Sequence, residues 1–288
     1  MKYFKRFVYL IYYLKELDFI KFLSFLNYSS EISGKSRIRL FADAFQSVFM
    51  FNISLLDYFS LGFLTQNKKE RSRWVGTGYM YEYQLRMNPK RAREILSDKK
   101  KFMDHYKKFV KRNYSDIKNL KASRADADNL LTNKSGKLVL KNSHGQIGAE
   151  VEVIVCADYD YPTLIDYMVH HNYDLVEEFV VQHKDLMELS PSGLNTVRII
   201  TQLADDKVEY LGARLRISVN SPVDNLAAGN LAAPIDMRTG TVNGPGIYSD
   251  ITKSQKSVHP VTGKPIEGFV IPFWREVVDL AEKAALHT

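Results

Sequence analysis

Three stretches of the sequence combine residue types that bind phosphate, and the first runs from Gly136 to Glu150. Lys141 ends an expected strand there, and a loop that contains Ser143, Gly145 and Gly148 leads into a second strand. Backbone N–H groups in a glycine loop can point together at an anion, and a lysine at the strand end supplies a positive charge. The loop is not a P-loop, because it lacks the GxxxxGKS or GxxxxGKT pattern and no helix follows it. The stretch therefore fits either a phosphate-binding loop or an ordinary hairpin loop.

The second stretch, Leu175 to His183, places two acids, Glu177 and Glu178, within an otherwise apolar strand. A carboxylate is costly to bury unless it is paired or hydrogen-bonded. The strand therefore either lies at an exposed edge of its sheet or has polar surroundings for a functional reason.

The third stretch carries cations on two neighbouring strands. Asn195 begins a strand that contains Arg198, and Arg214 and Arg216 share one face of the next strand. Arginines that project from adjacent strands onto one surface can hold phosphates or carboxylates. Exposed charge on a sheet surface is the alternative, and spacing alone does not decide whether the faces of the two strands coincide.

Other common chemistries lack their motifs. Ser143 and His144 are adjacent, but no GxSxG nucleophile motif surrounds them. The seven histidines lack the spacing of metal ligands, and the absence of GxGxxG counts against a dinucleotide-binding fold.

Composition narrows the class of protein. The chain has 288 residues, of which 45% are hydrophobic and 25% charged, which is typical of a globular protein with a sizeable core and excludes a disordered or collagen-like chain. The single cysteine, Cys156, excludes an intramolecular disulfide. A net charge of +7 favours an anionic partner such as a phosphorylated ligand or a membrane surface. Nucleic acid is disfavoured, because no zinc finger or RNP-type strand is present.

The N-terminal residues predict an amphipathic helix over Met1 to Leu17, and Asp18 is a plausible N-cap for a second helix. The apolar side of the first helix either packs on the rest of the protein or lies on an anionic membrane. Its longest apolar run, Phe7 to Leu14, is too short to span a bilayer, so we expect no transmembrane segment.

The remaining pattern predicts helices first and strands later. Residues 36–115 are expected to be mostly helical, and residues 161–171 and 273–286 to form two further helices. Strands are expected at 138–140, 150–155, 175–181, 196–203 and 208–219, with the last two joined as a hairpin at Ala204–Lys207. This order favours the α+β class.

Taken in order, these elements resemble the sugar-transfer-associated ATP-grasp family, which occurs with cell-surface polysaccharide biosynthesis. The resemblance runs from about Leu55 to the C-terminus and depends on the order and spacing of several short pieces. The pieces are Asp57-Tyr-Phe59, Asp98-Lys99, Lys141 with its glycine loop, Val176-Glu-Glu-Phe179, Leu194-Asn-Thr-Val-Arg198, Leu215-Arg-Ile217, Val223-Asp-Asn225 with Gly229, Ile235-Asp236 and Thr239-Gly240.

The resemblance implies an ATP-grasp fold, in which two α+β lobes hold a nucleotide between them. It divides the chain into a helical N-terminal region (residues 1–90), a smaller nucleotide-binding lobe (residues 91–176) and a larger lobe (residues 177–288). Lys141 is implied to approach the α- and β-phosphates, and Lys99 is implied to be the second nucleotide lysine, with Lys100 as its alternative.

The remaining site residues are also implied by the resemblance. A lid over the phosphates would contain Gly145 and Gly148, and Ser143 is a further nucleotide-binding candidate. The hinge beside adenine would comprise Glu177, Glu178, Phe179 and Val180. The catalytic candidates are Arg198 and Arg216, which would face the γ-phosphate or an acyl phosphate, and Asn195; Asn225 is a further nucleotide-binding candidate.

The implied reaction joins a carboxylate to an amine. ATP, held with Mg²⁺, phosphorylates the carboxylate, and the amine attacks the acyl phosphate. A uronic acid or an amino acid of a surface glycan is the implied carboxylate, which would place the protein in the cytoplasm or at the inner face of the cell membrane.

One part of the family pattern is missing. ATP-grasp proteins carry metal-binding acids after the helix that we expect at 273–286, typically an Asp or Glu and then a Glu-x-Asn strand, and Mg²⁺ requires such oxygen ligands. We therefore expect an incomplete enzyme whose metal-binding acids lie beyond Thr288. The alternative is a non-catalytic ATP-grasp-like binding module or a peripheral membrane scaffold protein.

Overall fold

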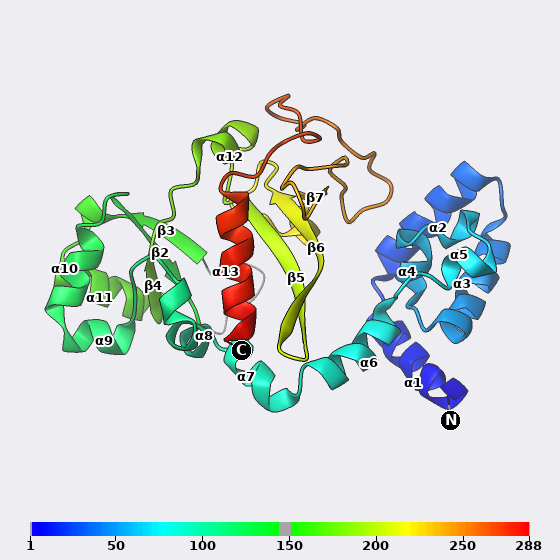
Figure 1. Ribbon diagram of the computed structural model, residues 1–288, viewed down its shortest axis with the longest axis horizontal. Coiled ribbons are helices and arrows are strands. Elements are labelled where there is room, and N and C mark those ends of the chain that lie inside the picture. The colour runs from blue at the N-terminus through cyan, green and yellow to red at the C-terminus, as the bar shows by residue number, and fades with distance from the viewer. Residues whose placement is uncertain (1, 144–150, 288) are drawn as a thin grey trace. The chain divides into compact units, whose positions relative to one another are not determined.

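The computed structural model describes residues 2–143 and 151–287, and the chain divides into two compact units (Figure 1). The first unit comprises Met1–Arg91 together with Tyr248–Ser254, and the second comprises Ala92–Ile247 together with Gln255–Thr288. The first unit is mainly helical, and the second contains two antiparallel sheets. The fold is therefore α+β, as the sequence predicts. The sequence did not indicate that Tyr248–Ser254 belongs to the first unit.

The helices of the first unit begin and end at residues with clear capping roles. Asp18 caps the second helix as predicted, because its carboxylate accepts a hydrogen bond from the backbone N–H of Lys21 at 2.9 Å. Gly34 and Asn52 end the second and third helices in the left-handed conformation. The helices are α1 (Lys2–Lys15), α2 (Phe19–Ser33), α3 (Arg37–Phe51), α4 (Leu55–Ser60), the 3-10 helix η1 (Phe63–Thr65), α5 (Lys68–Arg71) and α6 (Thr77–Met87).

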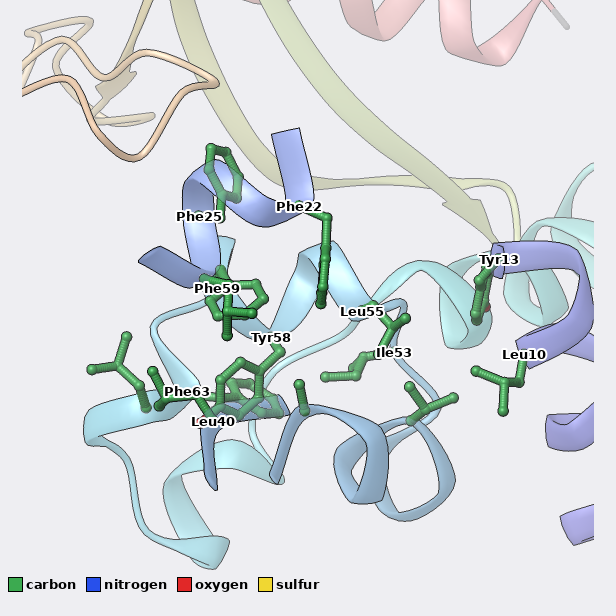
Figure 2. Packing of buried hydrophobic residues seen from close by; sticks show 14 residues of the cluster. Leu10, Tyr13, Phe22, Phe25, Leu40, Ile53, Leu55, Tyr58, Phe59 and Phe63 are labelled. Carbon is green, nitrogen blue, oxygen red and sulfur yellow. The ribbon is translucent and has the colours of Figure 1, made fainter. Parts of the chain in front are cut away.

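Aromatic rings build the core of the first unit (Figure 2). The ring of Phe59 meets those of Phe22 and Phe25 edge to face, with centroids 5.7 and 6.5 Å apart. Tyr58 and Phe63 make a similar contact at 6.2 Å. Edge-to-face packing is favourable because the positive ring edge meets a negative ring face.

Helix α1 buries only part of its apolar surface. Leu10 and Tyr13 lie in the core, and Arg6 is buried beside them, where its guanidinium donates a hydrogen bond to the backbone carbonyl of Phe49. Core packing therefore involves only one stripe of this helix. The apolar side chains that remain exposed are Phe4, Phe7, Val8, Ile11 and Leu14.

A partly buried ion pair joins α3 to α5. The guanidinium of Arg71 donates to both carboxylate oxygens of Asp43, at 2.7 and 2.8 Å, and also to the backbone carbonyl of Phe63 at 2.7 Å. The hydroxyl of Tyr58 donates to the same carboxylate at 2.7 Å. Burial alone would raise the pKa of Asp43, but hydrogen bonds from Arg71 and Tyr58 hold it below its ordinary value.

The second unit begins with short helices that lead to its first sheet, here called sheet A. These helices are α7 (Lys90–Ser97), in which the division between the units falls, α8 (Lys99–His105) and the 3-10 helix η2 (Lys107–Phe109). The strands of sheet A are β1 (Tyr114–Asp116), β2 (Lys137–Lys141), β3 (Val151–Val155) and β4 (Leu175–Glu178), in the order β1-β4-β2-β3, with all neighbours antiparallel. The two strands expected on either side of the glycine loop are present as β2 and β3, which pair with each other.

One face of sheet A is covered by α9 (Ile117–Ala122), α10 (Arg124–Leu131) and α11 (Tyr161–His170). Leu138, Leu140 and Val176 point to this face and are fully buried. Because side chains alternate along a strand, Val139, Lys141 and Glu177 point to the opposite face, here called the outer face. The 3-10 helix η3 (Cys156–Asp158) connects β3 to α11.

The second sheet, sheet B, follows α12 (Lys184–Leu189) and contains β5 (Thr196–Ala204), β6 (Lys207–Ile217) and β7 (Leu231–Ile235) in that order. The predicted β5–β6 hairpin is confirmed, and its turn residues Asp205 and Asp206 both have positive φ, which matches the twist of the strands. The 3-10 helix η4 (Leu226–Ala228) precedes β7. Helix α13 (Trp274–Leu286) confirms the last predicted helix and packs on β5 and β6 (Figure 1).

Two parts of the sequence interpretation change. Strand β4 lies between β1 and β2, so the suggestion that its acids mark an exposed edge is wrong, and polar surroundings explain them instead. Several elements were not predicted because they are short or atypical: β1 has three residues, and β7 contains Pro234. Helices α9, α10 and α12 were also missed.

We predict that Arg71→Lys lowers the free energy of unfolding of the first unit by about 1 to 2 kcal/mol. Lysine keeps a charge near Asp43 but cannot donate to both carboxylate oxygens and to a backbone carbonyl at once. Urea unfolding followed by circular dichroism measures the change. Arg73→Lys is the matched control at an exposed position of the same unit, and equal stability of the two variants would contradict the assigned role of the ion pair.

Candidate functional site

The outer face of sheet A carries a cluster of three charges. Glu177 is only 4% exposed, and one of its carboxylate oxygens accepts hydrogen bonds from Nζ of Lys141 at 2.8 Å and from Nε of Arg112 at 2.7 Å. Burial alone would raise the pKa of Glu177, but the two positive charges outweigh burial and hold the pKa below its ordinary value of 4.5. The carboxylate is therefore ionised at neutral pH, and the three charges sum to +1.

Strand register explains why these side chains meet. Val139 lies opposite Glu177, so Lys141, two residues further along β2, points to the same face and reaches the carboxylate diagonally. Arg112 precedes β1, which pairs with β4 on its other side. The cluster thus joins three segments that are far apart in the sequence.

Two further lysines hold the end of β2, where the glycine loop begins. Nζ of Lys99 donates to the backbone carbonyl of Asn142 at 2.7 Å, and Nζ of Lys100 pairs with Asp174 at 2.9 Å. The same carboxylate accepts hydrogen bonds from the backbone N–H and the hydroxyl of Ser143, both at 2.6 Å. The structure therefore brings the predicted residues Lys99, Lys141 and Ser143 to one end of sheet A. Gly145 and Gly148 lie outside the described residues.

Apolar side chains lie next to these cations. Val151 and Val153 of β3 are exposed, and they pair with Lys141 and Val139 of β2. Val155, further along β3, is also exposed. A flat apolar strip beside a group of cations offers complementary surfaces to an aromatic base and to phosphates. A cavity of about 520 Å³ lies near the same cluster and is lined by Lys100, Arg112 and Leu175, among others.

The predicted hinge follows β4 directly. The backbone N–H of Glu178 donates to Asn113 and that of Phe179 to Lys137, so sheet pairing extends to Phe179. The next residue, Val180, is exposed. Beyond it, the side-chain oxygen of Gln182 accepts a hydrogen bond from the backbone N–H of Asn195 at 2.7 Å, which attaches the end of the hinge to the start of β5.

Asn195 is buried, and its side chain contacts the protein backbone at several points. Its amide nitrogen donates to the carbonyl of Ser190 at 2.9 Å, and its oxygen accepts from the backbone N–H of Ser218 at 2.8 Å. These contacts connect the end of α12 to the end of β6. The structure supports a positioning function for Asn195, and its assignment as a catalytic residue stays a prediction.

The register of sheet B shows whether the arginines of β5 and β6 lie on the same face, which spacing alone did not decide. Arg198 lies opposite Arg214, and Arg216 lies opposite Thr196, so the three arginines share one face. Arg198 and Arg214 are exposed, whereas Arg216 is held by Asp224 at 3.0 Å. The hydroxyl of Thr196 donates to the same carboxylate.

The last predicted site residue, Asn225, begins η4. Its side-chain oxygen accepts a hydrogen bond from the backbone N–H of Ala227 at 3.1 Å, and its backbone carbonyl accepts one from Asn230. Asn225 therefore helps to shape the loop that follows Asp224, next to the arginine face. A contact with nucleotide stays a prediction for this residue.

Sequence reasoning missed Arg112, Asp174 and Asp224. Arg112 lies in a run of basic residues, and only its pairing with Glu177 distinguishes it. Asp174 immediately precedes the strand that carries Glu177, and an acid at that position was a usable signal for a partner of the nearby lysines. Asp224 lies within the quoted piece Val223-Asp-Asn225, but its pairing with Arg216 depends on the fold.

A metal site does not emerge from the residues that the structure describes. Within residues 2–143 and 151–287, no group of three or more His, Cys, Asp or Glu side chains could hold a metal ion. Mg²⁺ prefers carboxylate oxygens, and the described residues offer no ready-made group of three such ligands.

The second unit thus has cations gathered at the end of β2 and a second cationic face on sheet B. Residues 163–288 match the sugar-transfer associated ATP-grasp family, which confirms the expected resemblance for this part of the chain. The match includes Glu177, the hinge and the arginine face of sheet B, and it begins after Lys99 and Lys141. No match was found among curated proteins or among solved structures.

We predict that Glu177→Gln lowers the free energy of unfolding of the second unit by about 2 to 4 kcal/mol at neutral pH, because it leaves two cations without their shared carboxylate. The folded-state pKa of Glu177 is lowered, so its stabilising effect is complete above pH 4.5 and is lost as the pH falls through the folded-state value. The stability difference between wild type and variant should therefore shrink below pH 4.5.

Urea unfolding at a series of pH values measures this difference. Glu178→Gln is the matched control, since it removes an acid from the next position on the opposite face of β4. A difference in the free energy of unfolding between wild type and Glu177→Gln that does not vary with pH would contradict the assigned ion cluster.

Proposed function

We propose that the protein binds ATP on the outer face of sheet A and uses it to join a carboxylate to an amine through an acyl phosphate, in the biosynthesis of a cell-surface polysaccharide. The observation that carries the proposal is the cluster of Lys141, Arg112 and Glu177 beside the apolar strip of β3. The family match over residues 163–288 supports a nucleotide-binding, sugar-transfer-related function of the ATP-grasp type.

The charge cluster is suited to a polyphosphate. Glu177 compensates one of the two cations, which lowers the cost of keeping both of them partly buried. Because a positive charge remains, Lys141 can turn toward a phosphate oxygen while Arg112 keeps the carboxylate paired. Lys99 and Lys100 hold the adjoining backbone, so the loop starts from a fixed position.

The arginine face of sheet B is proposed to bind the transferred phosphate. In the first step, a carboxylate oxygen attacks the γ-phosphorus, the bond to the β-phosphate oxygen breaks, and ADP leaves. In the second step, an amine attacks the acyl carbon, inorganic phosphate leaves, the amine loses a proton, and an amide forms. Arg198 and Arg216 would stabilise the negative oxygens in both steps. No step of this scheme uses a protein-bound metal.

The substrate class follows from the family context rather than from any contact in the structure. A uronic acid or an amino acid of a surface glycan supplies the carboxylate in this proposal. Since cells hold ATP in the cytoplasm, the reaction would take place there, or at the inner face of the membrane if the glycan is attached to a lipid.

We predict that Lys141→Met weakens ATP binding by about 10- to 100-fold, the effect of losing one charge-assisted hydrogen bond in a partly buried site. Isothermal titration with ATP measures the change. Lys134→Met, which removes an exposed lysine from the turn before β2, is the matched control and should bind ATP like the wild type. Failure of the wild-type chain to bind ATP would overturn the proposal.

We also predict ATP-dependent formation of a hydroxamate when hydroxylamine replaces the amine and a uronic or amino acid supplies the carboxylate. Arg198→Ala should reduce this rate by about 100-fold, because the arginine stabilises charge that develops during transfer. Arg238→Ala, at another exposed position of the second unit, should leave the rate unchanged. ATP binding without any hydroxamate from a panel of carboxylates would retain the nucleotide site and reject the ligase reaction.

A further inference from the structure

The positive charge of the protein is concentrated in one of its two units. Residues 1–91 contain 15 Lys and Arg against 7 Asp and Glu, a net charge of +8, whereas residues 92–288 contain 25 against 26, a net charge of −1. The proposed nucleotide site therefore accounts for none of the overall excess. The excess positive charge of the helical unit therefore needs an explanation other than nucleotide binding.

Helix α1 carries a second apolar stripe in addition to the one that it buries. At 100° per residue, the buried residues Leu10 and Tyr13 lie on one side, and the exposed apolar residues cover an arc of about 120° beside them. Phe4 is 71% exposed. This stripe consists of Phe4, Phe7, Val8, Ile11 and Leu14.

The next two helices continue this pattern. Ile20 of α2 and Ile38 of α3 are 84% and 83% exposed. On α3, Ile38, Phe41 and Phe45 follow helical spacing on the side opposite the buried Leu40. The ring of Phe41 contacts that of Phe22 on α2, so the stripes belong to helices that pack directly on one another. The exposed apolar residues at the start of α2 are Phe19, Ile20 and Leu23.

Cations are placed on the same three helices. Residues 1–39 contain eight Lys and Arg against three Asp and Glu. Lys5, Lys15, Arg37 and Arg39 are exposed, so they are available to an external anionic surface. Among the described residues, no helix has the length and apolar character needed to cross a bilayer.

We propose that α1, α2 and α3 form a docking surface for an anionic lipid membrane, with their exposed apolar side chains inserted at the lipid interface and the adjacent cations on the lipid headgroups. Exposed aromatic and aliphatic stripes bordered by lysine and arginine are the features that let a helix lie in the plane of a membrane. The positive charge of this unit complements anionic headgroups. The surface extends beyond the single helix that the sequence indicated.

Vesicle co-sedimentation of the full chain tests the proposal. We expect binding to vesicles of phosphatidylcholine mixed with phosphatidylserine, and weaker binding both to phosphatidylcholine alone and at high salt. The triple variant Phe4→Ser, Phe7→Ser, Ile11→Ser should bind the mixed vesicles at least about tenfold more weakly, because it removes most of the apolar contact of α1. These side chains are exposed, so the fold should be kept, which circular dichroism checks.

Three matched substitutions serve as the control. Leu211→Ser, Val261→Ser and Val270→Ser change side chains that are similarly exposed in the second unit, and this variant should bind vesicles like the wild type. The charge variant Lys5→Glu, Lys15→Glu, Arg39→Glu should lose the preference for phosphatidylserine, and it gives an independent readout if the apolar variant does not fold.

Three outcomes would overturn the proposal. The first is a wild-type chain that does not bind the mixed vesicles. The second is equal binding by wild type and the apolar triple variant. The third is a wild-type dimer that the triple variant converts to a monomer, since a second copy of the chain would then cover this surface.

Discussion

The second unit depends on the neutralisation of one buried carboxylate. Glu177 lies in an interior strand, where an unpaired charge would cost several kcal/mol, and it is ionised because Lys141 and Arg112 both contact it. To supply these partners, the end of β2 and the segment before β1 must lie on either side of β4. The order β1-β4-β2-β3 of sheet A provides this arrangement. The same pairing gathers Arg112 and Lys141 on the outer face of sheet A, where the proposed nucleotide would meet them.

The two sheets divide the proposed chemistry between them. Sheet A offers an apolar strip and lysines, which suit a base and its first phosphates, whereas sheet B offers an arginine face, which suits the phosphate that is transferred. A hydrogen bond between Gln182 and Asn195 connects the end of the predicted hinge to the start of β5, the strand that carries Arg198. The helical unit contributes neither surface. Its charge and its exposed apolar stripes are explained by the proposed membrane-docking surface and not by the proposed reaction.

Features that depend on local spacing could be predicted from the sequence. The end of β2 at Lys141, the β5–β6 hairpin and the cap at Asp18 each depend on a few neighbouring residues, and each is confirmed. Features that depend on strand order could not be predicted from the sequence. The interior position of β4 and the function of Arg112 require pairings between segments more than sixty residues apart. The shared face of Arg198 and Arg216 likewise required a known register, because a shift of one residue would separate them. The buried side of α1 includes Arg6, a residue whose charge suggested exposure.

The central claim is that a nucleotide binds against Lys141 and Glu177 on the outer face of sheet A. Hydrogen–deuterium exchange of the full chain with and without ATP tests it most directly, because it reports position and does not require turnover. The account predicts that ATP slows exchange in the peptides that contain residues 137–143 and 175–182, and leaves helices α1 to α3 unchanged. Protection confined to other segments, with these two peptides unaffected, would contradict it.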